Sequence, residues 1–344
     1  MRALVLGLGA VGTRTARQLA SSAEVEQLLV VGRDAGRAEA VARSLGPVAV
    51  GAAWGPTTLD GVDVLVVAAP VTPTAAAFGS TGFSVGLVER AVRTGTRVVT
   101  VSDHPEVVHA LLGLDEAARR CGTTLVVGAG MSPGLTDVLA RFGALQLGSV
   151  DEIHVAKVGA GGPACARQHH RALTEDGRDW RDGSWVQRAS GSGRELCWFP
   201  EPVGGRDCYR AGLSEPRLLV RAFPTARRIT ARVAATRRDR LSAPLPMLRK
   251  PHPEGELGAV RVEVRGERDG RREVRVYGVL DRPAVACGAV AAVSALWAVE
   301  GRFTRTGAAG LAELVVEPGP FLAELARRGV KAAAFEGSAA VGAP

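Results

Sequence analysis

A glycine-rich turn at the start of the chain constrains its fold more than any other feature. Residues 3–8, "ALVLGL", form a short apolar run, and Gly7, Gly9 and Gly12 form G-x-G-x-x-G where a helical pattern opens. In this pattern the first glycine permits a tight turn, the second admits a pyrophosphate close to the backbone, and the third lets helix and strand pack closely. The turn therefore predicts a strand, a dinucleotide-binding loop and a helix in succession.

The same alternation of strand and helix continues through the first 130 residues. Short apolar runs, typical of strands buried on both faces, alternate with helical stretches. We therefore expect an α/β fold with a doubly wound parallel sheet of the Rossmann type over residues 1–130. The expected strands are 3–8, 27–32, 62–69, 96–102 and 123–130, and the expected helices are 11–21, 35–45, 82–94 and 105–121.

The pattern changes after residue 130, where apolar and polar residues alternate as in strands with one solvated face. This predicts a second, α+β substrate domain over residues 131–282, with a mixed or antiparallel sheet. Residues 160–216 show little periodicity, so we expect a long functional or mobile loop there. The expected strands are 151–158, 217–223, 259–265 and 273–280; helices at 283–301 and 318–329 belong to a C-terminal segment, 283–344, that returns to the first domain.

Composition narrows the class of protein. Of the 344 residues 46% are hydrophobic and 23% charged, as in a globular protein with a sizeable core and two domains. No apolar run reaches the roughly 18 residues needed to span a bilayer, so we expect a cytoplasmic protein without a membrane partner. The five cysteines are scattered and are expected to be reduced.

The net charge of +8 does not point to nucleic acid. The basic residues are spread along the chain and nearly all are arginines, so no basic patch is visible. An arginine-lined pocket for a phosphate or an anionic substrate explains the excess of positive charge better.

The end of the second expected strand bears on the choice of cofactor. An NAD site usually keeps an acidic residue there, but this chain has Gly32. The glycine leaves room for a 2′-phosphate, and Arg33, helped by Arg37, can supply the charge. We therefore expect NADP(H). The alternative is that Arg33 is solvated and that Asp34, which otherwise resembles a helix N-cap, turns inward to the ribose and selects NAD(H).

The reaction site should lie beyond the carboxyl ends of the strands, where a doubly wound sheet binds its ligands. Three turns arrive there: residues 69–71, 102–104 and 130–134. Ser132 and Pro133 are typical of a helix start, so we expect Ser132 to be a cap. Asp103 and His104 precede Pro105, and one of them must begin the next helix. Capping needs no neighbouring imidazole, so both are candidates for proton transfer.

Other polar residues have a functional and a structural interpretation. Lys157 is either a desolvated acid or base facing the cleft or an edge-strand lysine. His169 and His170 either belong to a lid over the substrate or are solvated. No third ligand stands at a helpful spacing from them, so we expect no metal. Arg210 and Arg221 are candidates for clamping a substrate carboxylate.

Four segments resemble the saccharopine dehydrogenase family of NAD(P)-dependent oxidoreductases. They are "VLGLGAVGTRTARQLA" at 5–20, the segment 94–107 that contains "VSDHPEV", "TTLVVGAGMSPGLTDVLA" at 123–140 and, more faintly, "RAFPTARRI" at 221–229. The resemblance covers roughly the first 150 residues and extends loosely to the end. It implies a Rossmann domain, a substrate domain inserted before a returning C-terminal segment, and reversible hydride transfer at a C–N bond through an imine.

Together, the pattern and the resemblance predict an NADP(H)-dependent oxidoreductase acting, as a homodimer, on a small, amino-acid-like substrate with a carboxylate. A reductase of carbonyl or enoyl intermediates, or a non-catalytic NADP(H)-binding protein, are the alternatives. By analogy with the family, the 103–104 turn and the 133–134 helix start face the nicotinamide. The expected cofactor contacts are Gly7, Gly9, Ala10, Val11, Gly12, Gly32, Arg33, Asp34, Arg37, Ala69, Pro70, Ser102, Gly130 and Met131.

Overall fold

The N-terminal part of the chain forms a seven-stranded sheet in which all neighbouring strands are parallel. The computed structural model describes residues 1–55, 58–73, 83–247 and 251–334. The strand order is β17-β8-β7-β4-β1-β2-β3, so the direction of winding reverses between β1 and β4. The strands are β1 (Arg2–Leu6), β2 (Gln27–Gly32), β3 (Ala49–Ala53), β4 (Val64–Val67), β7 (Arg97–Thr100), β8 (Thr124–Val126) and β17 (Gly307–Ala309).

Helices cover both faces of this sheet, which confirms the doubly wound fold. Alternate residues of β1 enter different cores: Ala3 and Val5 pack with α1 (Ala10–Ala20), α2 (Ala35–Leu45) and α10 (Pro283–Val299). Leu4 and Leu6 pack with α3 (Val85–Arg93), α4 (Pro105–Leu112) and α5 (Asp115–Arg120) on the other face. A strand whose successive side chains all find apolar partners reads as a continuous apolar run, which is the pattern of residues 3–8.

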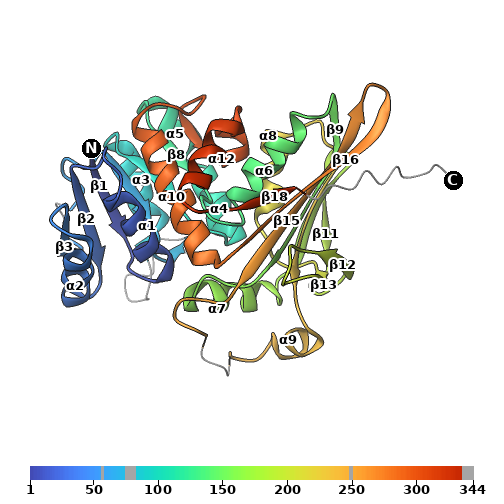
Figure 1. The fold of residues 1–344 in the computed structure, drawn as a ribbon, viewed down its shortest axis with the longest axis horizontal. Coiled ribbons are helices and arrows are strands. Elements are labelled where there is room, and N and C mark those ends of the chain that lie inside the picture. The colour runs from blue at the N-terminus through green and yellow to red at the C-terminus, as the bar shows by residue number, and fades with distance from the viewer. Residues whose placement is uncertain (56–57, 74–82, 248–250, 335–344) are drawn as a thin grey trace.

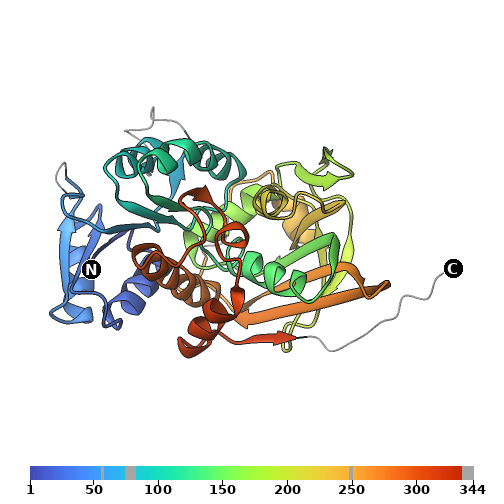
Figure 2. The ribbon, with the colours of Figure 1, turned by 90° about the horizontal axis from the view of Figure 1, so that it is seen from above.

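The second sheet is mixed, as expected, and lies beside the first (Figures 1 and 2). Its order is β11-β10-β14-β9-β15-β16-β18, with β13 attached to β14 and β12 to β13; among the described residues only the β14–β9 pair of this sheet is parallel. The strands are β9 (Ser149–Val158), β10 (Gly177–Arg181), β11 (Ser184–Arg188), β12 (Glu195–Trp198), β13 (Gly205–Tyr209), β14 (Arg228–Ala234), β15 (Gly258–Arg268), β16 (Arg271–Asp281) and β18 (Ala332–Ala334).

The remaining elements are short. A two-stranded parallel ladder joins β5 (Val71–Thr72) to β6 (Phe83–Ser84). The helices are α6 (Leu135–Ala144), α7 (Pro163–Ala172), α8 (Glu215–Ala222), α9 (Arg237–Ser242), α11 (Leu311–Leu314) and α12 (Pro318–Arg327).

The strand expected at 217–223 is wrong, because this segment forms helix α8. Its buried positions Leu218 and Leu219 lie one turn before Phe223, which suits a helix as well as a strand. Pro216 in the first turn is the signal that decides between them, since a proline there is typical of a helix start.

The long loop expected over residues 160–216 is also wrong, because it holds α7 and the strands β10 to β13. Buried polar side chains hide the alternation: Asp179 on β10 is buried and receives a hydrogen bond of 2.7 Å from the buried Arg210 beyond β13. A pattern of apolar inside and polar outside cannot find a strand whose inner face carries an ion pair.

The C-terminal segment connects both sheets. Helix α10 runs beside α1 in Figure 1, and the fit is close, since a Cβ added to Gly288 would lie 2.7 Å from Cβ of Arg14. Strand β17 then joins the first sheet and β18 the second. Residues 335–344, the end of the expected segment, lie outside the described residues. Within the described part of the chain no helix is both long and apolar enough to cross a membrane.

Candidate active site

A cleft of about 1080 Å³ opens where the carboxyl ends of the first sheet face the second sheet and α7. It is lined both by the turn after β1 and by residues of β9 and α7, so the cleft joins the dinucleotide-type loop to the second domain. Every residue expected to touch the cofactor lines it except Gly12, which is buried beneath the turn.

The glycine turn has the geometry that its three glycines predict. Gly7 has a φ of +101°, and a Cβ on Gly12 would lie 1.7 Å from the carbonyl oxygen of Gly7, so helix and turn are in close contact. At Gly9, by contrast, an added Cβ would meet nothing within 4 Å. The open space lies at the start of α1, where the amides of Ala10 and Val11 have no earlier helical partner. The turn thus fits a pyrophosphate.

At the end of β2, arginine side chains line the cleft and the nearby acidic side chain is engaged in a helix cap. Gly32 is buried and lines the cleft beside the exposed Arg33 and Arg37. Within the described residues neither guanidinium is recorded in an ion pair or a hydrogen bond. The side chain of Asp34 accepts a hydrogen bond of 3.0 Å from the amide of Arg37, so this carboxylate is the N-cap of α2.

A buried ion pair reaches the cleft through Lys157. Nζ of Lys157 on β9 is 2.7 Å from Oε1 of Glu215 at the start of α8, and both side chains are almost fully buried. The ammonium also donates to the carbonyl oxygen of Ser132 at 3.2 Å, and the Ser132 hydroxyl donates to the same carboxylate oxygen at 2.7 Å. Because β9 lies between β14 and β15, Lys157 is not an edge-strand residue.

Each partner keeps the other charged. Burial alone would lower the pKa of Lys157, but the carboxylates of Glu215 and Asp103 outweigh burial and raise that pKa. Burial alone would raise the pKa of Glu215, but the charge and hydrogen bond of Lys157 outweigh it, so the pKa of Glu215 is lowered. Lys157 is therefore an ammonium at neutral pH, which carries a proton and cannot accept another, while its raised pKa makes it a weaker acid than a free lysine.

The Asp103–His104 turn also lines the cleft. Nδ1 of His104 accepts a hydrogen bond from the Glu106 amide, so His104 is the N-cap of α4, and its Nε2 is 3.6 Å from Glu175. Burial raises the pKa of Asp103, although the charge of Lys157 opposes this shift. His104 is therefore the capping residue, and Asp103 lines the cleft without a capping role.

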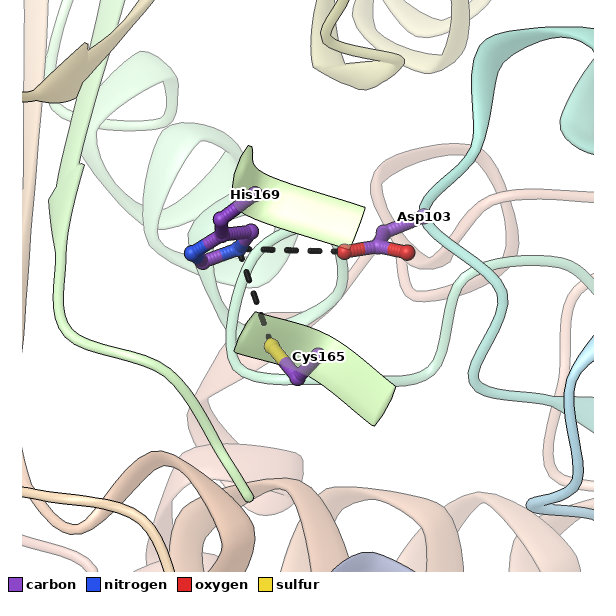
Figure 3. A group of neighbouring side chains, drawn as sticks. All are labelled: Asp103, Cys165 and His169. Carbon is purple, nitrogen blue, oxygen red and sulfur yellow. Dashed lines mark hydrogen bonds and ion pairs between the residues drawn. The ribbon is translucent and has the colours of Figure 1, made fainter. Parts of the chain in front are cut away.

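Helix α7 brings two further groups to Asp103 (Figure 3). Cys165 and His169 stand one turn apart on this helix, with Sγ 3.7 Å from Nε2. The same Nε2 is 3.8 Å from Oδ2 of Asp103. Burial, and after it the charge of Lys157, lowers the pKa of His169 to about 3, so the imidazole is neutral.

Three residues expected at the substrate do not line the cleft. His170 points elsewhere on α7 and bonds the carbonyl oxygen of Leu245. Arg210 is buried in its pair with Asp179, and Arg221 pairs with Glu313 and Asp115. Each guanidinium already has a carboxylate, and neither is available as a clamp in this structure.

Sequence reasoning missed Glu215 and Cys165 and misassigned Ser132. Helix α6 begins after Gly134, and the Ser132 hydroxyl bonds Glu215 instead of capping. Glu215 lay beside a segment taken for a strand, so nothing indicated that its carboxylate is buried. The four-residue spacing of Cys165 and His169 was the signal available, once the segment is recognised as a helix.

No protein-family model matches the chain. Among solved structures it is similar to apo saccharopine dehydrogenase (L-Glu forming) from Saccharomyces cerevisiae, with a TM-score of 0.70 over 97% of this chain and 99% of that chain, at 16% identity. This chain has the fold of saccharopine dehydrogenase. The fold that the four sequence segments implied is thus confirmed.

Two other structures superpose less closely. The DAP dehydrogenase of C. glutamicum in complex with DAP has a TM-score of 0.49 at 12% identity, covering 95% of this chain and 98% of that one. GenD2 from gentamicin A biosynthesis in complex with NAD has a TM-score of 0.47 at 16% identity, covering 98% and 97%.

Proposed function

We propose that this protein is an NADP(H)-dependent oxidoreductase that transfers a hydride to or from the carbon of a C–N bond in an amino-acid-like substrate. One observation carries the proposal: a single cleft joins the glycine turn to the ammonium of Lys157. A cofactor held at the turn and extended along the cleft would bring its nicotinamide towards this group. The overall likeness to saccharopine dehydrogenase supports the same reaction class.

The end of β2 supports the choice of NADP(H). A 2′-phosphate would meet Arg33 and Arg37, whose guanidinium groups have no recorded counter-charge in the described part of the chain. The acid that could favour NAD(H) is Asp34, and its side chain is engaged as a helix cap. Arginine matches phosphate oxygens in a bidentate manner.

The cleft fits a charged substrate beside the cofactor. Bound NADPH would supply the hydride for the carbon of a C=N group. Lys157 lines the cleft and is placed to donate the proton that the nitrogen gains. Arg167 on α7 lines the cleft, is exposed, and has no recorded ion pair in the described residues. We therefore assign the substrate carboxylate to Arg167, in place of Arg210 and Arg221.

The cofactor assignment is tested with Arg33→Asp. We expect the dissociation constant of NADPH to rise at least about tenfold, because a charge-assisted contact of about 1.5 kcal/mol or more is lost, while NADH binding changes little. Calorimetric titration of both nucleotides measures this. Arg43→Asp, at the exposed far end of α2, is the matched control. Equal losses for NADPH and NADH would refute the 2′-phosphate site.

The role of Lys157 is tested with the double variant Lys157→Met, Glu215→Gln. Removing one charge alone would leave the other buried and unpaired, at a cost of about 3 to 5 kcal/mol, whereas the neutral pair avoids this. We expect kcat to fall at least about 100-fold, as for loss of a general acid, with NADPH affinity preserved. Rates with imine and carbonyl panels are read from NADPH absorbance. Unchanged kcat would remove Lys157 from the chemistry, and turnover of carbonyls alone would select the alternative substrate class.

A further inference from the structure

The group of Asp103, Cys165 and His169 brings three possible metal-ligand atoms together, and hydrogen bonding explains only the contact between Cys165 and His169. Nε2 of His169 is 3.8 Å from Oδ2 of Asp103, beyond the range of a hydrogen bond. Its distance to Sγ of Cys165 is 3.7 Å, and the three possible ligand atoms lie within 4.8 Å of one another. Figure 3 shows Nε2 turned towards both partners, with the other ring nitrogen pointing away.

The two separations measured from Nε2 of His169 are close to those around a shared cation. Ligand atoms around tetrahedral zinc, bound at about 2.0 to 2.3 Å, stand roughly 3.3 to 3.7 Å apart. One thiolate, one imidazole and one carboxylate are all zinc ligands, and catalytic zinc sites keep three protein ligands and one open position. Cys165 and His169 are held in register by one turn of α7, while Asp103 approaches from the turn after β7.

The nearest buried charges do not exclude a cation. Lys157 interacts electrostatically with two carboxylates, Glu215 and Asp103, so its positive charge is shared between them. The ammonium is engaged at 2.7 Å by Glu215, which limits its repulsion of a metal.

We propose that Asp103, Cys165 and His169 bind a zinc-type divalent cation whose open position faces the cleft. The inference deepens the proposed function: a cation there would bind an oxygen or nitrogen of the substrate next to the reacting carbon and hold it for hydride transfer. From the sequence we expected no metal, since no third ligand stands at a helpful spacing from His169 and His170. Folding brings Asp103 to His169 from a distant part of the chain.

The test uses untagged full-length protein, freed of metal with a chelator and titrated with Co²⁺ and then Zn²⁺. We expect one equivalent to bind, with an intense near-ultraviolet thiolate-to-cobalt band that Zn²⁺ displaces. Cys165→Ser should abolish the band and weaken binding at least tenfold, and His169→Ala should weaken it likewise. Cys121→Ser, which removes an exposed thiol outside the cleft, is the matched control and should change neither.

Two results would overturn the proposal: no stoichiometric binding by the folded wild-type protein, or equal binding by wild type and Cys165→Ser. Circular dichroism of each variant shows that it is folded. NADPH titration of the metal-free protein separates this outcome from failure of the proposed function, because nucleotide binding at the glycine turn needs none of the three ligands.

Discussion

Two buried carboxylates near the cleft behave in opposite ways because of their neighbours. Glu215 is paired with Lys157 and stays charged. Asp137 on α6 is fully buried without such a partner, and burial, with the nearby charge of Glu215 added, raises its pKa well above the ordinary value. Asp137 is therefore protonated in the folded protein over a range of pH in which the unfolded chain ionises it.

This difference predicts the sign of a stability change. A carboxyl whose folded pKa is raised weakens the folded state as pH rises above about 3.9, its unfolded pKa. We expect Asp137→Asn to raise the free energy of unfolding at pH 7 by about 1 kcal/mol or more, since one pKa unit is worth about 1.4 kcal/mol. The gain should disappear at or below about pH 4. Urea unfolding at both pH values measures it.

Asp115 provides a control of opposite sign. Burial alone would raise the pKa of Asp115, but its hydrogen bond and charge interaction with Arg305 outweigh burial and lower it. Asp115→Asn should therefore destabilise at pH 7, and the loss should shrink as pH falls below about 4. If the wild type and Asp137→Asn had the same free energy of unfolding at every pH, the raised pKa of Asp137 would be contradicted.

At the scale of elements, the sequence predicts strands well where apolar residues face both helical layers. An unbroken apolar run of strand length was enough to predict β1, β2, β4, β7 and β8. Strand β3 was not predicted, because the residues of "AVGAA" have small side chains and are partly exposed at the sheet edge. The helix expected over 105–121 is two helices, α4 and α5, separated at Gly113 and Leu114.

The contact between α1 and α10 gives a test of packing. A Cβ on Gly288 would lie 2.9 Å from the carbonyl carbon of Arg14 and 3.0 Å from the amide nitrogen of Thr15, which are backbone atoms that cannot rotate away. We expect Gly288→Ala to destabilise by about 1 to 3 kcal/mol, despite alanine's better helix propensity, because overpacking dominates. The urea midpoint measures this.

Gly319 on α12 is the matched control, since a Cβ there would meet nothing within 4 Å. Gly319→Ala should be neutral or stabilising by up to about 1 kcal/mol. If both substitutions stabilise, α10 is not packed against α1 as closely as this structure has it.

At the scale of the whole molecule, the candidate site shows where sequence reasoning stops. The glycine turn and its arginines are local in the chain, so spacing alone places them together. Lys157, Glu215 and Asp103 come from two domains and meet only because the second sheet and α8 face the first sheet. No periodicity predicts that meeting, and the charge of Glu215 could be assigned only once its partner was known.

The glycine turn also lets fold stability and cofactor binding be separated. Anything that binds only the folded state stabilises it by mass action, by about 2.7 kcal/mol at 100 times the dissociation constant. We expect NADPH at that excess to raise the Tm of the wild-type protein. Gly9→Val should lower the Tm without nucleotide only slightly, through the poorer N-cap, because its Cβ enters open space, but should abolish the NADPH-induced rise. Gly12→Val should lower the Tm itself, since a Cβ there meets the Gly7 carbonyl oxygen at 1.7 Å. Scanning calorimetry measures all three proteins. A Gly9→Val protein still stabilised by NADPH would mean that the pyrophosphate does not lie on this turn.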